Sequence, residues 1–297
     1  MPELPDLTVY IEALERRVLG RPIEKIRLAS PFVLRSVSPS VAEVIGKKVV
    51  RIERLGKRII FVLEDDLFAV IHLMVAGRFQ WKDEPGAKVP GKLGLLAIDF
   101  PNGTLLLTEA STKKRASLHL ARGRAALEAF SRGGLEPIGS SVAAFTEALQ
   151  RERHTLKRAL TDPRLFAGIG NAYSDEILHR AKMSPVTRTD RLEPAAIAVL
   201  HDATLAVLDE WTRRLRDETG DDFPKKVTAF RPEMAVHGKY GQPCPVCGTK
   251  VQRIVYAENE SNYCPRCQTG GKLLADRSLS RLLKENWPRT IEELEGK

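Results

Sequence analysis

Two kinds of hydrophobic segment are absent from this chain, and each absence excludes a class of protein. The chain begins MPELPDLTVY, without the basic stretch and the apolar stretch of a secretory signal peptide. It contains no run of the roughly 18 apolar residues that a membrane-spanning helix requires. We therefore expect a protein that acts in the cytoplasm and has no membrane partner. The chain also lacks internal repeats and low-complexity tracts.

Cysteine is scarce, and its placement indicates a metal site. The four cysteines of the chain are Cys244, Cys247, Cys264 and Cys267. They form two Cys-x2-Cys pairs separated by sixteen residues, a spacing in which the intervening residues can form a β-hairpin between two zinc-binding turns. Without an export signal, a metal site is a better interpretation than disulfides. Four thiolates leave no open position for catalysis, so we expect one structural Zn²⁺.

The composition indicates a globular protein with an acidic partner. The chain has 297 residues, of which 43% are hydrophobic, enough for a sizeable core in two domains or one large one. The net charge is +9 and the isoelectric point is near 9.4. Such a balance favours nucleic acid as a partner, although a merely basic surface would give the same numbers.

The first part of the chain predicts a helix followed by strands. Leu7, Ile11, Leu14 and Val18 recur at helical spacing, and Gly20 ends the pattern. Short runs rich in β-branched and other apolar residues follow, some of them separated by turn residues. They are Ile23–Leu28, Val49–Leu55, Ile59–Leu63, Phe68–Leu73, Leu93–Phe100 and Thr104–Glu109. We predict an α+β protein whose residues 1–125 form a mostly antiparallel β-sandwich with one N-terminal helix.

The remainder predicts a helical domain, the finger and an extension. Segments with helical character are Ala125–Arg132, Val142–Leu149, His154–Leu160, Ala172–Ala181, Pro194–Leu215 and Lys272–Glu285. We expect a helical domain over residues 138–235, a zinc finger over 236–270 and a C-terminal helical extension over 271–297. Within the helical domain, Gly168-Ile169-Gly170-Asn171 lies between two helices. Its glycines and the following helix start could approach a phosphate, although an ordinary turn has the same pattern.

Five motifs in order resemble the formamidopyrimidine-DNA glycosylase and endonuclease VIII family. They are the start Pro2-Glu3-Leu4-Pro5, the pair Gly56-Lys57 before a strand, His72-Leu73 followed by Gly77, the loop Gly168–Asn171, and the four cysteines with their sixteen-residue gap. The match covers residue 1 to about residue 267. The resemblance implies a catalytic β-sandwich, a helix–two-turn–helix domain and a zinc finger, acting as a monomer on double-stranded DNA with damaged bases or abasic sites.

The resemblance also implies a chemistry for these residues. Removal of Met1 would expose the α-amine of Pro2, and such amines titrate near about 8, so a useful fraction is neutral and nucleophilic. Attack on the sugar C1′ would expel the base, and the resulting iminium would favour elimination of the flanking phosphates. Glu3 would act as acid and base, and Lys57 would hold a phosphate. His72 and Asn171 are expected to contact DNA after the base is flipped out of the helix.

Three segments depart from the family pattern. Met74 stands one position earlier than the family's methionine, which on a strand would reverse the face of its side chain. The wedge segment is replaced by Glu109–Ser117, whose basic residues we expect to grip the DNA backbone. These residues are Lys113, Lys114 and Arg115. Asn259 stands where the finger has an arginine, so we expect Arg253 to contact DNA in its place.

Several interpretations of function stay open at this point. The leading one is a DNA glycosylase with abasic-site lyase activity on bases of the 8-oxoguanine or formamidopyrimidine type. An enzyme for oxidised pyrimidines, or a lyase specific for abasic sites, shares the same motifs. A non-catalytic protein that binds damaged DNA is a further alternative, favoured by Asn259 and opposed by Pro2, Glu3 and Lys57. A zinc-ribbon module for RNA or transcription fits the motifs least.

Overall fold

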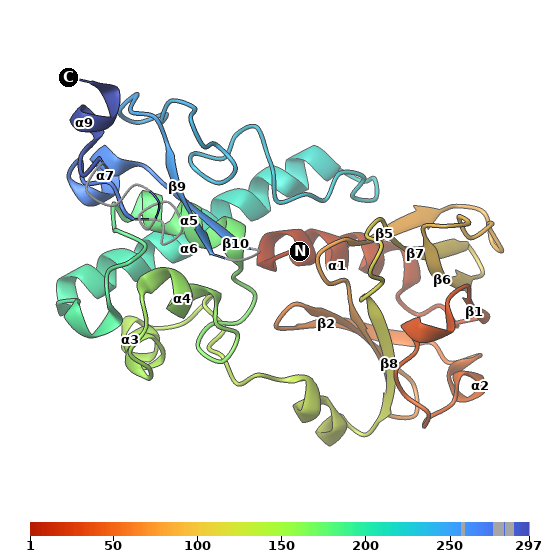
Figure 1. The fold of residues 1–297 in the computed structure, drawn as a ribbon. Helices are drawn as coiled ribbons and strands as arrows, with labels where there is room; N and C mark the ends of the chain where they lie inside the picture. The colour runs from red at the N-terminus through yellow and green to blue at the C-terminus, as the bar shows by residue number, and fades with distance from the viewer. Residues whose placement is uncertain (257–258, 276–281, 283–287, 297) are drawn as a thin grey trace. The chain divides into compact units, whose positions relative to one another are not determined.

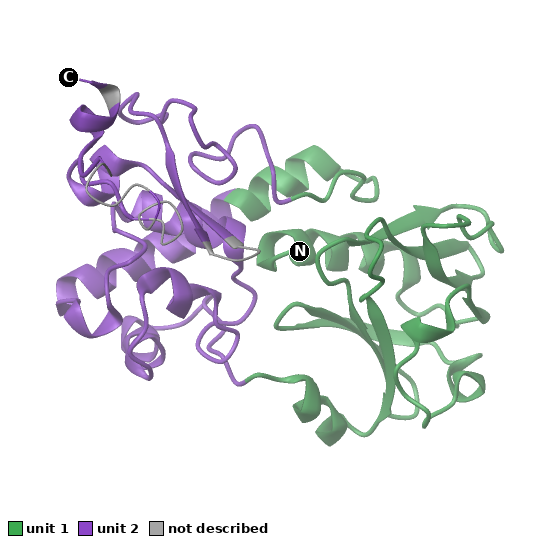
Figure 2. Cartoon of the chain, in the orientation of Figure 1, with its two compact units in different colours: residues 1–132, 211–228 green, residues 133–210, 229–297 purple. Residues whose placement is uncertain are grey.

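The chain divides into two compact units. The computed structural model describes residues 1–256, 259–275, 282 and 288–296. Unit 1 comprises residues Met1–Arg132 and Trp211–Thr228, and unit 2 comprises Gly133–Glu210 and Ala229–Lys297 (Figure 2). Helix α6 (Pro194–Thr219) contributes residues to both units, so each unit is assembled from two separate stretches of sequence.

Unit 1 is the predicted helix plus antiparallel sandwich (Figure 1). One sheet has the strand order β1-β6-β7-β5 and the other the order β2-β3-β4-β8, and every pairing is antiparallel. The strands are β1 (Lys25–Leu28), β2 (Val49–Leu55), β3 (Arg58–Leu63), β4 (Leu67–His72), β5 (Gly77–Lys82), β6 (Gly94–Phe100), β7 (Gly103–Glu109) and β8 (Ser117–Arg122). The short helices are η1 (Pro31–Val33), α2 (Val41–Val44) and η2 (Arg124–Phe130).

The core of unit 1 lies between the two sheets and under helix α1 (Leu4–Val18). Leu7, Leu14 and Val18, which the helical spacing predicted to share a face, are all fully buried in this core. Side chains from both sheets join them, among them Phe61 on β3 and Phe100 on β6. Burying one face of each element against the others is what holds α1, and with it the chain start, at a fixed place on the sandwich.

Three elements of unit 1 differ from the expectation. Strand β8 occupies residues that the sequence marks only as part of a basic stretch, yet it pairs with β4 along its whole length. Strand β5 was not predicted either, and it pairs with β7. The segment Ala125–Arg132, expected as an α-helix, is the 3₁₀-helix η2, whose Leu127 packs on a second cluster with Phe68 and Val70 of β4.

Unit 2 contains the predicted helical domain. Its helices are α3 (Val142–Gln150), α4 (Leu156–Thr161), η3 (Thr189–Arg191), α5 (Asn171–Arg180) and the first part of α6. Polar caps set two of the helix starts: the Ser141 hydroxyl accepts a hydrogen bond from the Ala144 N–H, and Thr155 accepts one from Arg158. The α+β fold with a helical second part is therefore confirmed.

The finger follows as a hairpin and a short helix. Strand β9 (Gln252–Tyr256) pairs antiparallel with β10 (Asn259–Tyr263), and α7 (Pro265–Thr269) follows. Most of the helix expected over Lys272–Glu285 lies outside the described residues, and its first residues, 272–275, are not helical. Lys272 instead pairs with Thr290, and Ile291 of α9 (Ile291–Glu295) is buried.

The length and hydropathy of the helices were compared with what a membrane-spanning helix requires. None of the helices in the described part of the chain combines the length and the apolar character needed to cross a bilayer.

Candidate functional site

The chain start is built into the beginning of α1. Pro2 and Glu3 are buried, and Pro5 occupies the first turn of the helix, where its missing N–H costs nothing. Glu3 and Asp6 form a reciprocal capping box, in which the Glu3 N–H donates to the Asp6 carboxylate at 3.0 Å. The predicted nucleophile and its neighbouring acid are therefore held by regular secondary structure rather than by a loose end.

Four charged side chains act electrostatically on the α-amine of Met1, the residue that precedes Pro2. Burial lowers the pKa of this amine below its ordinary value. The carboxylates of Glu3 and Asp6 raise it, and the cations of Arg78 and Lys57 lower it. The structure thus brings Lys57, from another part of the sequence, into electrostatic range of the chain start. Arg78 is an additional member that the sequence motifs did not indicate.

Lys57 lies in the tight turn between β2 and β3. Gly56, next to it, has a φ of 58°, a left-handed conformation that glycine adopts without strain. The Arg54 guanidinium donates to the Gly56 carbonyl at 2.9 Å, which fixes the turn. Gly56 therefore allows the two-residue turn that places Lys57 between β2 and β3.

His72 ends strand β4 and is largely buried. In register it lies opposite Arg58 on β3 and Ser117 on β8. Burial, assisted by the nearby charges of Arg58, Lys57 and His119, lowers the pKa of His72 to about 4. The imidazole is therefore neutral at physiological pH, and it can act as a hydrogen-bonding group but not as a cation.

The turn after His72 exposes Val75 rather than Met74. Met74 has a φ of 54°, which is unusual for a side chain of its size, and it is half-buried. Val75 is 61% exposed at the tip of the turn. Gly77 closes the turn, because a Cβ at this position would lie 2.1 Å from the Leu73 carbonyl oxygen. The one-residue displacement of methionine in the sequence therefore leaves valine as the projecting apolar side chain.

The basic segment 111–116 folds around a buried carboxylate. Glu109, only 2% exposed, accepts hydrogen bonds from the N–H groups of Arg115 and Ala116 at 2.8 and 3.0 Å. The Lys114 ammonium donates a hydrogen bond to the backbone carbonyl of Glu109. Lys113 and Arg115 are exposed, whereas Lys114 is half-buried. Two of the three predicted backbone-gripping residues therefore face solvent, and the third is engaged inside the loop.

In unit 2, Asn171 connects helix α5 to the finger hairpin. Its side-chain amide donates to the Glu260 carbonyl at 2.8 Å, and its own carbonyl accepts from Lys157 at 2.7 Å. Asn171 is the first residue of α5, and Gly170 is the N-cap. The Asn171 side chain therefore joins the start of α5 to β10 of the finger hairpin.

A buried ionic network holds the same helix to the finger. Asp175 is fully buried and accepts from Lys157 at 2.6 Å, from the His237 ring at 2.8 Å and from the Ser261 hydroxyl at 3.2 Å. Burial alone would raise the pKa of Asp175, but Lys157 and His237 outweigh it and hold the pKa below the ordinary value. This carboxylate thus joins α4, α5, β10 and the segment before the finger.

Glu176, the next residue of α5, fixes that segment through its backbone. Its carboxylate accepts from the N–H groups of Ala235, Val236 and His237 at 2.8 to 2.9 Å. Sequence motifs indicated neither Asp175 nor Glu176, because most of their partners lie about sixty or more positions away in the chain. An acidic pair shortly after a Gly-x-Gly-Asn loop is the available signal in the sequence.

Arg253 lies on β9 of the finger hairpin, and its side chain already has partners. Its guanidinium stacks over the Tyr240 ring, 4.4 Å from the centroid, and pairs with Glu260 at 3.0 Å. Asn259 is the first residue of β10, where its backbone pairs with Tyr256. The hairpin therefore carries a basic side chain opposite Asn262, three pairs along the hairpin from Asn259, and the Glu260 carboxylate lies against it.

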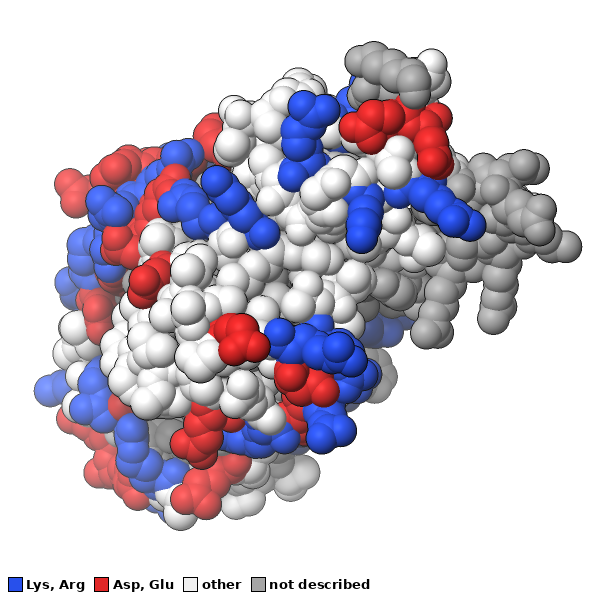
Figure 3. Space-filling model, turned by 90° about the vertical axis from the view of Figure 1, so that its left-hand side faces the viewer, with Lys and Arg blue, Asp and Glu red and all other residues white. Residues whose placement is uncertain are grey.

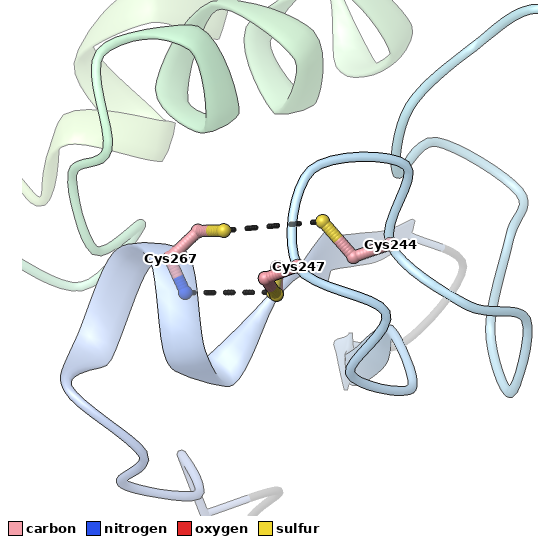
Figure 4. A group of neighbouring side chains, drawn as sticks. Cys244, Cys247 and Cys267 are labelled. Atoms are coloured by element: carbon pink, nitrogen blue, oxygen red, sulfur yellow. Dashed lines mark hydrogen bonds between the residues drawn. The ribbon is translucent and has the colours of Figure 1, made fainter.

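The four cysteines form a compact thiolate site. All four sulfur atoms lie within 4.8 Å of one another, with 3.9 Å between those of Cys244 and Cys267. Figure 4 shows these two sulfurs pointing toward each other. Four thiolates at such separations suit tetrahedral Zn²⁺, so the expected zinc site is confirmed. The His179 ring nitrogen lies 3.3 Å from the Cys244 sulfur, which connects the site to α5.

The surface charge is mixed where Figure 3 shows it. Lys and Arg side chains are interspersed with Asp and Glu on that face. Although the net charge of the chain is +9, this face is therefore not uniformly basic.

Comparisons with known proteins agree with these features. The formamidopyrimidine-DNA glycosylase N-terminal domain matches residues 1–119, its H2TH domain matches 134–219, and the zinc finger found in FPG and IleRS matches 241–270. The formamidopyrimidine-DNA glycosylase of Ligilactobacillus salivarius is 31% identical over 280 residues, which are 90% of this chain and 99% of that protein.

Solved structures of the Lactococcus lactis FPG are also similar. Its complex with DNA containing Fapy-dG is 28% identical, covers 90% of this chain and all of that one, and has a TM-score of 0.79. Its complex with DNA containing an oxidised pyrimidine has the same identity and coverage and a TM-score of 0.78. The chain therefore belongs to the formamidopyrimidine-DNA glycosylase family, the family of DNA-repair enzymes that its motifs resemble.

Proposed function

We propose that the chain excises oxidised bases from double-stranded DNA and then cuts the strand, with the Pro2 amine as nucleophile once Met1 is removed. One observation carries the proposal: the charges of Glu3, Lys57 and Arg78 act on the α-amine of Met1, one residue before Pro2, and burial lowers the pKa of that amine. We expect the same surroundings to act on the Pro2 amine once Met1 is removed, and only a neutral amine can attack.

The proposed reaction balances at each step. The Pro2 nitrogen bonds to C1′ of the damaged nucleotide while the bond from C1′ to the base breaks, and the base leaves with a proton. Glu3 protonates the sugar ring oxygen as the ring opens, which leaves an iminium between the nitrogen and C1′. Loss of a C2′ proton then expels the 3′ phosphate, and a second elimination expels the 5′ phosphate. Water finally hydrolyses the iminium and frees the amine.

The other site residues would hold the DNA. Lys57 would bind a phosphate beside the damaged nucleotide, as the point charge that a lysine supplies. Neutral His72, the exposed Lys113 and Arg115, and Asn171 would add contacts to the backbone. Arg253 would contribute from the hairpin. We propose a monomer that acts on chromosomal DNA and is therefore cytoplasmic.

The projecting turn would fill the space left by the flipped base. Val75 is its exposed apolar side chain, so we assign this part to Val75 rather than to Met74. Valine is shorter than methionine and fills less of the gap. The relatives' structures with Fapy-dG and with an oxidised pyrimidine are compatible with either lesion class for this chain, and we favour the 8-oxoguanine and formamidopyrimidine type.

Trapping with borohydride tests this proposal. The protein is incubated with duplexes that carry 8-oxoguanine, formamidopyrimidine, thymine glycol or an abasic site, and the iminium is reduced to a stable adduct. We expect an adduct with at least one duplex, and its loss both in Pro2→Gly and in a form that retains Met1. Absence of an adduct with all four duplexes would overturn the proposal.

The second candidate is a protein that binds damaged DNA without turnover. The pairing of Arg253 with Glu260 favours it, since this pair reduces the positive charge of the hairpin. It predicts binding to the same duplexes with no adduct and no strand cutting, so the same experiment separates the two functions.

A further inference from the structure

Arg78, the second residue of β5, makes three hydrogen bonds to backbone carbonyls. Its Nε donates to Val227 at 2.5 Å, and one terminal nitrogen donates to Gly77 at 2.7 Å and to Val75 at 3.0 Å. Val75 and Gly77 belong to the projecting turn after β4, whereas Val227 lies about 150 positions later. One half-buried side chain thus joins two distant stretches of unit 1.

The stretch that contains Val227 is itself fixed to helix α1. Phe223 packs on Tyr10 with 5.7 Å between ring centroids, and the Arg17 guanidinium lies 5.5 Å from the Phe223 centroid. Arg17 also donates to the Asp221 carbonyl at 3.0 Å. Residues 221–227 are therefore a strap held along helix α1, which directly follows Pro2 and Glu3, and Arg78 fastens the far end of this strap.

The charge of Arg78 also reaches the chain start. Two cations, Arg78 of β5 and Lys57 of the β2–β3 turn, and two carboxylates, Glu3 and Asp6, act electrostatically on the α-amine of Met1. Arg78 forms its hydrogen bonds above with neutral carbonyl groups, which orient the guanidinium without cancelling its charge. A guanidinium is protonated at every pH of interest, so this charge is permanent.

We propose that Arg78 is a positioning residue of the proposed reaction, which fastens the projecting turn to the 221–227 strap and keeps a positive charge near the chain start. The inference rests on the proposed function, in which the amine attacks the sugar and the turn fills the space left by the flipped base.

Two substitutions at Arg78 separate the effect of its charge from the effect of its hydrogen bonds. Arg78→Lys keeps the charge but loses the fork of donors, whereas Arg78→Met loses both.

The charge is tested without DNA, by NMR titration of the Pro2 amine in protein labelled with ¹³C-proline. Removing a nearby cation stabilises the protonated amine, so Arg78→Met should raise the pKa by up to about one unit. Arg78→Lys should titrate close to the unsubstituted protein. A merely structural role would leave the pKa unchanged in both variants, and equal titration of all three proteins would overturn the electrostatic part.

The fastening is tested by hydrogen–deuterium exchange. In Arg78→Met we expect faster exchange in residues 74–77 and 221–228 together, with α1 residues 7–18 unchanged. Arg78→Lys should show a smaller increase at the same two places. Unchanged exchange in both stretches would overturn the fastening, and exchange that rises throughout unit 1 would show a folding defect and overturn the specific role as well.

A kinetic readout connects the inference to the reaction. At pH 6 the rate of adduct formation on an abasic duplex should fall up to about tenfold in Arg78→Met and recover at pH 9, because less of the amine is neutral at the lower pH. If the unsubstituted protein forms no adduct at any pH, the proposed function fails. The titration and the exchange still decide the role of Arg78 in that case.

Discussion

The chain start and the finger hairpin both carry positive charge, but they hold it differently. At the chain start, Arg78 hydrogen-bonds three backbone carbonyls and its charge still acts on the amine. On the hairpin, Arg253 is paired with Glu260 and stacked on Tyr240. The residues that we propose for the attack are thus present in unit 1, whereas the arginine that we propose as a DNA contact in unit 2 is paired with a carboxylate. We therefore expect this chain to differ from its relatives in DNA contact more than in chemistry.

The largest effect should come from the acid at the chain start. Glu3→Gln keeps an acceptor for the capping box but cannot protonate the sugar, so base excision should slow by roughly 10²- to 10⁴-fold. Adduct formation on a preformed abasic site, which has no base to expel, should suffer less. Single-turnover excision assays measure both rates, with the exposed Glu24→Gln as a control for loss of a carboxylate. Excision by Glu3→Gln at the unsubstituted rate would remove Glu3 from the mechanism.

The buried network of unit 2 should dominate stability. Asp175→Asn removes the charge that pairs with Lys157 and His237, and breaking a buried ion pair costs about 3 kcal/mol of unfolding free energy. Because the pKa of Asp175 is depressed, its contribution is complete above about pH 4 and is lost as the pH falls below it. Denaturant titration at pH 7 and at acidic pH measures this.

A matched control for Asp175 is available on the surface of the same unit. Asp190→Asn breaks the exposed pair with Arg188, which solvent screens, so the free energy of unfolding should change much less than in Asp175→Asn. Equal destabilisation by the two substitutions would contradict the account of a buried network that ties the hairpin to α5.

Lys57 tests the chain start as a DNA contact. Lys57→Gln should weaken binding to an abasic duplex about tenfold and reduce the slope of log affinity against log salt by about 1, since one phosphate contact is lost. Titration by fluorescence anisotropy at several salt concentrations measures both quantities. Lys25→Gln, at an exposed position on β1, removes the same charge elsewhere in unit 1 and should leave the slope nearer the unsubstituted value.

The smallest effect should come from the hairpin pair. Glu260→Gln releases Arg253 from its carboxylate, so DNA affinity at low salt should rise by about two- to fivefold. Glu147→Gln, an exposed substitution on α3, makes the same change in net charge and serves as the control. An equal rise in DNA affinity in both variants would mean that Glu260 does not restrain Arg253. It would then contradict the proposed difference between Arg253 on the hairpin and Arg78 near the chain start.

Local features of the fold and of the candidate site were predictable from the sequence. Helical spacing identified the buried face of α1, and the cysteine spacing identified the zinc site, because both depend on residues close together in the chain. The same applies to the Gly56-Lys57 turn, where glycine is required by a positive φ. The displacement of Met74 is visible in the sequence. The projection of Val75 in its place is not, because it depends on the backbone conformation of the turn.

Features that depend on distant partners were not predictable. Arg78 resembles any other arginine until Val227 is folded against it, and Asp175 resembles a helix surface residue until His237 and Ser261 close over it. Strand β8 did carry a local signal, because Ser117, Leu118, His119 and Leu120 alternate polar and apolar residues, and the structure pairs the strand with β4 along its whole length. Tertiary contacts supplied what residue patterns could not.

Mass spectrometry of the borohydride-trapped protein tests the central claim most directly. After digestion, the sugar remnant should lie on the N-terminal peptide, with Met1 absent and the added mass on Pro2. A remnant on Lys57 or on any other lysine would contradict the assignment of Pro2 as the nucleophile.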